Sequence, residues 1–258
     1  QRPPHAPGVR HAAVATRARR VRRRTGGPRR GPGRALAAPA LAAAVAGLVG
    51  GALWWRAASR RRPLPCPAWM AWLLSNPYTH ALAGPAAVLD GLGLAPGMRV
   101  LDAGCGPGRL TLPAAERVGS EGEVIALDVQ ASMLERVRAA AAARGLTNVR
   151  TLRGSIESVD LGVATVDRAF LVAVLGEVPD RAGALRALHA ALRPGGVLSV
   201  TELLPDPHYQ TRRTVRRLGE RAGFCHDGEQ GNWLAFTMRF RKPAAAPSGD
   251  RSAAVTWA

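Results

Sequence analysis

The chain has 258 residues, 36 Lys and Arg against 18 Asp and Glu, a formal net charge of +18 and 47 % hydrophobic residues. This length predicts one catalytic-size domain with extensions, and three cysteines without a repeat or heptad pattern exclude disulfide scaffolds, coiled coils and collagen-like chains. The charge is uneven, because residues 1–89 carry 15 Arg and no acid, whereas residues 90–258 sum to only +3. The high net charge therefore describes the N-terminal segment, and it does not by itself indicate nucleic-acid binding.

The N-terminal third divides into three segments, none of which predicts a globular core. Residues 1–34 are Arg, Pro, Gly and Ala, a composition typical of disorder. Residues 35–55 carry no charge and would form a helix about 31 Å long, which matches a bilayer core, so we expect a transmembrane or targeting helix. Residues 56–75 are a basic and aromatic linker whose arginines would attract anionic lipid. We expect membrane association through residues 35–62 with the following domain in the cytoplasm, or a cytoplasmic protein if the segment is absent or cleaved.

Residues 76–242 alternate apolar runs with amphipathic segments, which predicts an α/β domain with an open, doubly wound parallel sheet. The expected strands are 98–102, 123–128, 149–152, 166–175, 197–202 and 233–240. The expected helices are 83–94, a helix that ends at 118, 132–144 and 212–222. A further helix is expected between Asp180, which would cap its start, and the sequence Pro194-Gly195-Gly196, which would end it. The 132–144 helix begins with a predicted capping box of Ser132 and Glu135. Residues 243–258 are a Pro, Ala and Ser tail that we expect to be disordered.

A glycine-rich turn follows the first predicted strand. Its glycines stand at alternate positions, Gly104, Gly106 and Gly108. Glycine tolerates positive φ and lets the backbone approach a ligand, and Asp128 at the end of the next strand would reach the same crevice and hold ribose hydroxyls. A dinucleotide-binding turn needs a third glycine where Arg109 stands, whereas Asp102 suits the cationic amino group of S-adenosylmethionine (SAM). We therefore expect SAM as the cofactor.

The stretch VLDAGCGPG at 100–108 resembles the cofactor motif of class I SAM-dependent methyltransferases, in the methyltransferase type 11 or quinone-methyltransferase-like group. The stretches VIALDVQASML at 124–134, VDRAFLVAVLGEVPD at 166–180 and LRPGGVLSVTE at 192–202 extend the resemblance in the matching order. It implies a Rossmann-like seven-stranded sheet. It also implies an enzyme that transfers a methyl group from SAM to a small acceptor, such as a quinone or a lipid.

The resemblance also implies the cofactor contacts. Asp102 and the backbone of Gly104, Cys105 and Gly106 would hold the methionine end of SAM, and Asp128 would hold its ribose. Val129 and Met133 would border the adenine. The group often has an acid after the glycine that follows the third strand, but Ser155 stands there in this chain, so the Ser155 hydroxyl and the Ile156 backbone would hold the adenine instead.

Catalytic candidates follow the fourth and fifth predicted strands, and they are Glu177, Glu202, His208 and Tyr209. Methyl transfer from a sulfonium is a direct displacement, so catalysis is largely alignment, although an oxygen or nitrogen nucleophile also needs a base. His208 is the best base by residue type, since an ordinary imidazole is neutral near pH 7. The alternative is that His208 and Tyr209 only shape their loop. The basic helix face of Arg212, Arg213, Arg216 and Arg217 is either solvated or contacts anionic lipid or substrate.

Three functions remain open at this point. The first is a methyltransferase that acts on a small molecule at a membrane. The second acts on RNA or protein, but the Arg-rich residues 1–34 lie across a predicted membrane segment from the domain, so we expect no nucleic-acid partner. The third is a SAM-binding protein without transferase activity, which no sequence feature favours. The cysteines lack metal-ligand spacing, so we expect no metal.

Overall fold

The computed structural model describes residues 84–204 and 206–244, together with the helical positions Ala43, Ala46, Gly47 and Gly50. The segments predicted at 1–34, 35–55, 56–75 and 243–258 therefore lie outside the described residues, apart from these four positions and residues 243–244. Within the described part of the chain, no helix has the length and apolar character needed to span a bilayer.

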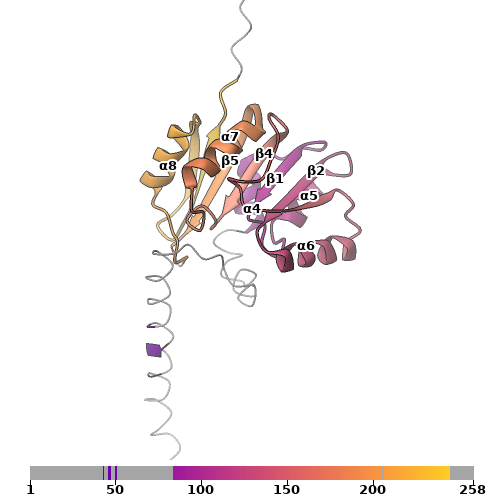
Figure 1. Ribbon diagram of the computed structural model, residues 1–258, viewed down its shortest axis with the longest axis horizontal. Coiled ribbons are helices and arrows are strands. Elements are labelled where there is room, and N and C mark those ends of the chain that lie inside the picture. The colour runs from indigo at the N-terminus through magenta and orange to yellow at the C-terminus, as the bar shows by residue number, and fades with distance from the viewer. Residues whose placement is uncertain (1–42, 44–45, 48–49, 51–83, 205, 245–258) are drawn as a thin grey trace, which may run out of the picture. The chain divides into compact units, whose positions relative to one another are not determined.

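Seven strands form one sheet in the order β3-β2-β1-β4-β5-β7-β6 (Figure 1). The strands are β1 (Arg99–Ala103), β2 (Glu123–Asp128), β3 (Val149–Arg153), β4 (Val166–Val172), β5 (Leu192–Leu203), β6 (Cys225–Gly231) and β7 (Ala235–Arg241). All neighbours pair in parallel except β7, which runs antiparallel to both β5 and β6. The strand order reverses between β1 and β4, and ligands bind at such a switch point, beyond the carboxyl ends of the strands.

Helices cover both faces of this sheet (Figure 1). They are α4 (Pro85–Leu89), the 3-10 helix η3 (Asp90–Leu92), α5 (Thr111–Val118), α6 (Ala131–Ala143), α7 (Arg181–Ala191) and α8 (Arg212–Arg221). Helices α4 and α5 pack on the face that Val100 and Phe170 enter, and α7 and α8 pack on the face that Leu101 and Leu171 enter. Neighbouring residues of β1 and β4 thus pack into opposite cores, which explains why Val100 and Leu101, and likewise Phe170 and Leu171, are apolar in succession.

The doubly wound architecture is confirmed, and so are the second strand at 123–128 and the cap by Asp180. The Asp180 carboxylate accepts a hydrogen bond from the Gly183 N–H at 2.8 Å, just before α7 begins. The sheet is mixed rather than parallel at one end, because β7 runs antiparallel to β5 and β6. Strand β6 was missed because CHDGEQG has no apolar alternation, and this edge strand leaves most of its residues partly or fully exposed.

Other predicted boundaries were also wrong for local reasons. Helix α6 begins after Gln130, which places Ser132 inside the first turn and rules out the predicted capping box. The fourth strand ends at Val172 rather than at 175, because Ala173 adopts a left-handed conformation with φ of 56°. The predicted helix stop at Pro194 to Gly196 falls within β5, since α7 already ends at Ala191.

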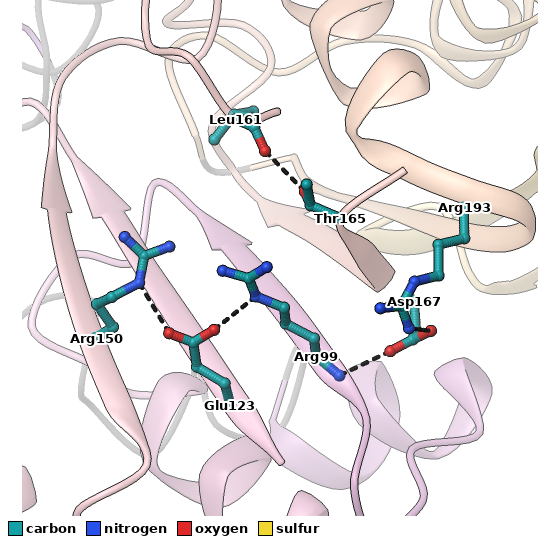
Figure 2. A network of polar contacts seen from close by, with 7 residues as sticks. All are labelled: Arg99, Glu123, Arg150, Leu161, Thr165, Asp167 and Arg193. Atoms are coloured by element: carbon teal, nitrogen blue, oxygen red, sulfur yellow. Dashed lines mark hydrogen bonds and ion pairs between the residues drawn. The ribbon is translucent and has the colours of Figure 1, made fainter. Parts of the chain in front are cut away.

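A network of charges lies at the amino ends of the strands, away from the switch point (Figure 2). Glu123 accepts from Arg99 Nε at 2.6 Å and from Arg150 Nε at 2.8 Å. Asp167 accepts from the Arg99 N–H at 2.8 Å and also from the Arg193 guanidinium. The arginines in these pairs are about one third to one half exposed, and exposed pairs contribute only about 0–1 kcal/mol each. We therefore assign this network a role in aligning strand starts.

Candidate cofactor and acceptor site

The glycine turn between β1 and α5 closes tightly over the end of β2. Its three glycines are all left-handed, with φ of 83° at Gly104, 51° at Gly106 and 89° at Gly108. The N–H groups of Gly104 and Cys105 both donate to the Leu127 carbonyl, at 2.8 and 3.0 Å. A Cβ at Gly104 would overlap the Val174 side chain. Position 104 therefore requires glycine for its conformation and also for its space.

Asp128 braces this turn from the end of β2. One carboxylate oxygen accepts from the Gly106 N–H at 2.9 Å, and the other accepts from the Gln130 N–H at 2.9 Å. The residue is 8 % exposed, and burial raises the pKa of its carboxyl. Each oxygen keeps acceptor capacity, as two ribose hydroxyls require. The sequence indicated the ribose role, but the bond to Gly106 has no signal in residue spacing.

Asp102 lies at the end of β1 and is 4 % exposed. Its carboxylate accepts from the Thr111 hydroxyl at 2.6 Å, at the first residue of α5. Burial raises the pKa of Asp102 to about 7, and the Asp128 charge adds to this, while the Thr111 hydrogen bond and the Arg109 charge oppose it. A cationic ligand beside Asp102 would favour the charged carboxylate and lower this pKa. Sequence reasoning missed Thr111, because a threonine opening a helix is common.

The predicted adenine contacts differ in their exposure. Val129 leaves 43 % of its surface exposed directly after Asp128, so it offers an apolar surface beside the carboxylate predicted to bind the ribose. Met133 is 1 % exposed and Ile156 is 4 % exposed, so neither side chain presents surface to a ligand as it stands. The Ser155 and Ser158 hydroxyl oxygens lie 2.6 Å apart, and either one can donate.

The adenine side is also tied to the end of β2. The Gly154 N–H donates to the Asp128 carbonyl at 3.1 Å, which holds the turn carrying Ser155 and Ile156 against the end of β2. Only main-chain contact with Ile156 is compatible with the burial of its side chain. The roles of Met133, Ser155 and Ile156 stay predictions.

The loops after β4 and β5 meet on the other side of the switch point. His208 is 6 % exposed, and its Nδ1 lies 3.7 Å from an Asp206 oxygen and 3.9 Å from a Glu177 oxygen. Gly176 lies so close to the His208 backbone that a Cβ at position 176 would overlap the His208 carbonyl. The structure therefore brings the predicted Glu177 and His208 together. It adds Asp206, which sequence reasoning missed because an acid in a Pro-rich loop is not distinctive.

Glu202 lies beneath this group and is 1 % exposed. One of its oxygens accepts from the Gln210 N–H at 2.9 Å, and the other has no hydrogen-bond partner among the described residues. Burial raises the pKa of Glu202 to about 8, and the charges of Asp206 and Glu177 add to the effect. Glu202 is therefore largely protonated at neutral pH, and its hydrogen bond to Gln210 anchors the loop that carries His208.

Tyr209 packs its ring edge-on against Phe236, with ring centroids 6.1 Å apart.

Cys105 is 6 % exposed, and burial raises the pKa of its thiol, so its side chain stays neutral. Cys225 is exposed. Among the described residues, no three His, Cys, Asp or Glu side chains are grouped so as to bind a metal ion.

Comparison with known proteins places this geometry in one class. Residues 100–196 match the sequence family described as a methyltransferase domain. A ubiquinone/menaquinone biosynthesis C-methyltransferase, UbiE, from Shewanella oneidensis is 34 % identical over 122 residues, covering 47 % of this chain and 49 % of that protein. The nocamycin O-methyltransferase of Saccharothrix syringae is 36 % identical over 122 residues, covering 46 % of this chain and 43 % of that protein. The chain thus spans about half the length of the curated relatives it matches.

Solved structures extend the match to the whole described domain. A SAM-dependent methyltransferase from Aquifex aeolicus is 25 % identical with a TM-score of 0.64, and the match covers 69 % of this chain and 99 % of that one. The [4+2]-cyclase SpnF shares the fold at 18 % identity, covering 62 % of this chain and 81 % of that one, with a TM-score of 0.57. Residues 100–196 are therefore a methyltransferase domain, and the described sheet has the fold of class I SAM-dependent methyltransferases.

Proposed function

We propose that this protein transfers a methyl group from SAM to a small-molecule acceptor. The observation that carries the proposal is the glycine turn braced on Asp128 beside Asp102. The turn supplies left-handed backbone for close approach, Asp128 supplies acceptors for a ribose, and Asp102 supplies a carboxylate that a cation would ionise. These three features fit SAM, which has an amino group, a ribose and no pyrophosphate.

SAM supplies an electrophilic methyl group on a sulfonium. In this proposal Asp102 and the backbone of Gly104, Cys105 and Gly106 hold the methionine end. Asp128 accepts hydrogen bonds from the ribose hydroxyls, and the exposed Val129 packs against the adenine. Met133, from within α6, supports the apolar surface that Val129 presents to the adenine. Ser155 and the Ile156 backbone hold the adenine edge. The chain's contribution is mainly alignment of the two reacting atoms.

On the acceptor side we propose that His208 takes the proton of an oxygen or nitrogen nucleophile. Its Nδ1 lies near both Asp206 and Glu177, and these carboxyl groups would stabilise the imidazolium that forms. Tyr209 borders the same loop and would position the acceptor. A carbon acceptor that is already nucleophilic would need only alignment, so the need for His208 depends on the acceptor atom.

The names of the relatives support a small-molecule acceptor. They include the UbiE and nocamycin enzymes and an aklanonic acid methyltransferase, DauC, from a Streptomyces species, which is 36 % identical over 105 residues.

We further propose membrane association through residues 35–62, on the strength of the uncharged run at 35–55 and the arginines that follow it. A methyl-transfer domain at 76–242 would then lie in the cytoplasm, where SAM is made.

The test is methyl transfer by the full chain from methyl-labelled SAM to a panel of phenols, quinols, carboxylic acids and amines. We expect label in one class of organic product, and we expect Gly104→Ala to abolish it by filling the space next to Val174. Arg136→Ala, an exposed change on α6, is the matched control and should keep full activity. Transfer that survives Gly104→Ala, or tight SAM binding without transfer to any acceptor, would contradict the proposal.

A further inference from the structure

An exposed tryptophan stands beside the acceptor side of the site. Trp233 is 70 % exposed, in the turn of residues 232–234 that joins β6 to β7. The turn is well ordered by hydrogen bonds, since the Asn232 side-chain oxygen accepts from the Leu234 N–H at 2.8 Å. The Leu234 carbonyl accepts from the Leu204 N–H at 2.7 Å, which ties the turn to the end of β5. The fold therefore holds this large apolar side chain in solvent at the carboxyl edge of the sheet.

A basic face lies next to this turn. Four arginines of α8 are exposed, and they are Arg213, Arg216, Arg217 and Arg221. The helix buries its opposite side through Val215 and Gly219. Its one acid, Glu220, pairs with Arg216 at 3.1 Å, and no ion pair engages the other three arginines within the part of the chain that the structure describes. The outer face of α8 therefore keeps a net positive charge.

Arg212 links the basic face, the turn and the acceptor loop. Its guanidinium donates to the Asn232 carbonyl at 2.7 Å, and it lies over the Phe236 ring at 4.6 Å from the centroid. The Tyr209 ring contacts the same Phe236 edge-on. A surface that engaged Trp233 and the first turn of α8 would therefore lie directly beside the loop that carries His208.

We propose that Trp233 and the basic face of α8 dock onto the headgroup region of an anionic lipid bilayer. Tryptophan favours the boundary between headgroups and hydrocarbon, where its ring is apolar and its N–H stays hydrated. Arginine binds phosphate through a planar fork, and basic side chains at an anionic surface attract it electrostatically. A nucleic acid or another soluble polyanion would use the arginines but would not require the exposed Trp233 indole. The proposal does not depend on methyl transfer, since it concerns only where the domain docks.

The arginine-rich residues 1–62 would also bind anionic lipid, so the test compares variants of the full chain. Affinity for vesicles of equal parts phosphatidylglycerol and phosphatidylcholine is measured by co-sedimentation. Arg213→Ala combined with Arg217→Ala should weaken binding about 25-fold, at about fivefold for each charge. Trp233→Ala should also weaken it. The control, Arg136→Ala with Arg138→Ala on α6, removes the same charge from another exposed helix and should change affinity less than about twofold.

Hydrogen exchange of the full chain locates the contact. Anionic vesicles should protect the amides of residues 231–234 and 212–214, and vesicles of phosphatidylcholine alone should not. The proposal is overturned if the α8 variant and the α6 control bind alike, or if these amides are not protected. It is also overturned if heparin protects them equally and Trp233→Ala leaves vesicle binding unchanged, because the surface would then belong to a soluble polyanion.

Discussion

Replacing Asp102 by Asn should uncouple SAM binding from pH. The pKa of Asp102 is raised from 3.8 to about 7, mainly by burial. If SAM binds through its amino group to the charged carboxylate, its apparent affinity falls as that carboxylate takes up a proton. A pKa near 7 then predicts that the dissociation constant of the wild-type protein falls about fivefold between about pH 6 and pH 7. An α-amino group loses its proton only near pH 8, so the change in affinity between about pH 6 and pH 7 reports a titration in the protein and not in SAM.

Asp102→Asn cannot titrate and should lose this slope, apart from any part due to Asp128, whose pKa burial also raises. At pH 7 and above, the variant should also bind SAM about 10- to 150-fold more weakly, since a charged hydrogen bond contributes roughly 1.5–3 kcal/mol. Calorimetric titration at several pH values measures both effects. Glu135→Gln, an exposed change on α6, serves as control. Equal slopes in the wild type and in Asp102→Asn would refute the assignment of the amino group to Asp102.

The same carboxyl predicts an effect of opposite sign on folding. An acid whose pKa is higher in the folded state binds more protons there, so its contribution to the free energy of unfolding falls as pH rises from 3.8 to about 7. Raising the pH should therefore weaken the unliganded fold while it strengthens SAM binding. Urea denaturation of the wild type and of Asp102→Asn across this range tests the sign, and the variant should show the smaller decline.

Further predictions concern single side chains. Asp128→Ala should weaken SAM binding by about 1.5–3 kcal/mol, and an unchanged calorimetric affinity would remove the ribose role. Glu202→Gln should remove only the share that Glu202 contributes to the loss of stability between pH 4.5 and about 8, so a denaturation profile that declines as steeply as the wild type would count against its raised pKa. His208→Ala should lower turnover about 10²- to 10⁴-fold with SAM affinity intact, whereas near-normal turnover would leave His208 as a loop residue. Asp180→Ala should cost about 1 kcal/mol of stability, measured by urea denaturation, through loss of the α7 cap.

The sequence predicted the cofactor half of the site better than the acceptor half. Asp102, the glycines and Asp128 lie in one local pattern of strand, turn and helix, and the physics of that pattern is largely independent of the rest of the chain. The bond from Gly106 to Asp128 joins residues 22 apart, and residue spacing does not show it. The candidate cofactor site could therefore be located in the sequence, while the contacts that brace it could not.

The acceptor side depends on tertiary packing. The contact between Gly176 and the His208 backbone brings together two loops that follow different strands, and it depends on the backbone path of both loops. Strand β6 was missed for a related reason, since its polar sequence becomes a strand only by pairing with β7. Ala173 ends β4 early because its backbone is left-handed, and the apolar pattern at 166–175 gives no indication of this conformation. In the first two cases a long-range contact decided the local structure.

The central claim is that the edge formed by the glycine turn, Asp102 and Asp128 is a SAM site. Calorimetric titration of the full chain with SAM and, separately, with NADH tests it most directly. We predict saturable binding of SAM that Asp128→Ala weakens, and no measurable binding of NADH. Micromolar binding of NADH, or the absence of SAM binding by a folded wild-type protein, would contradict it.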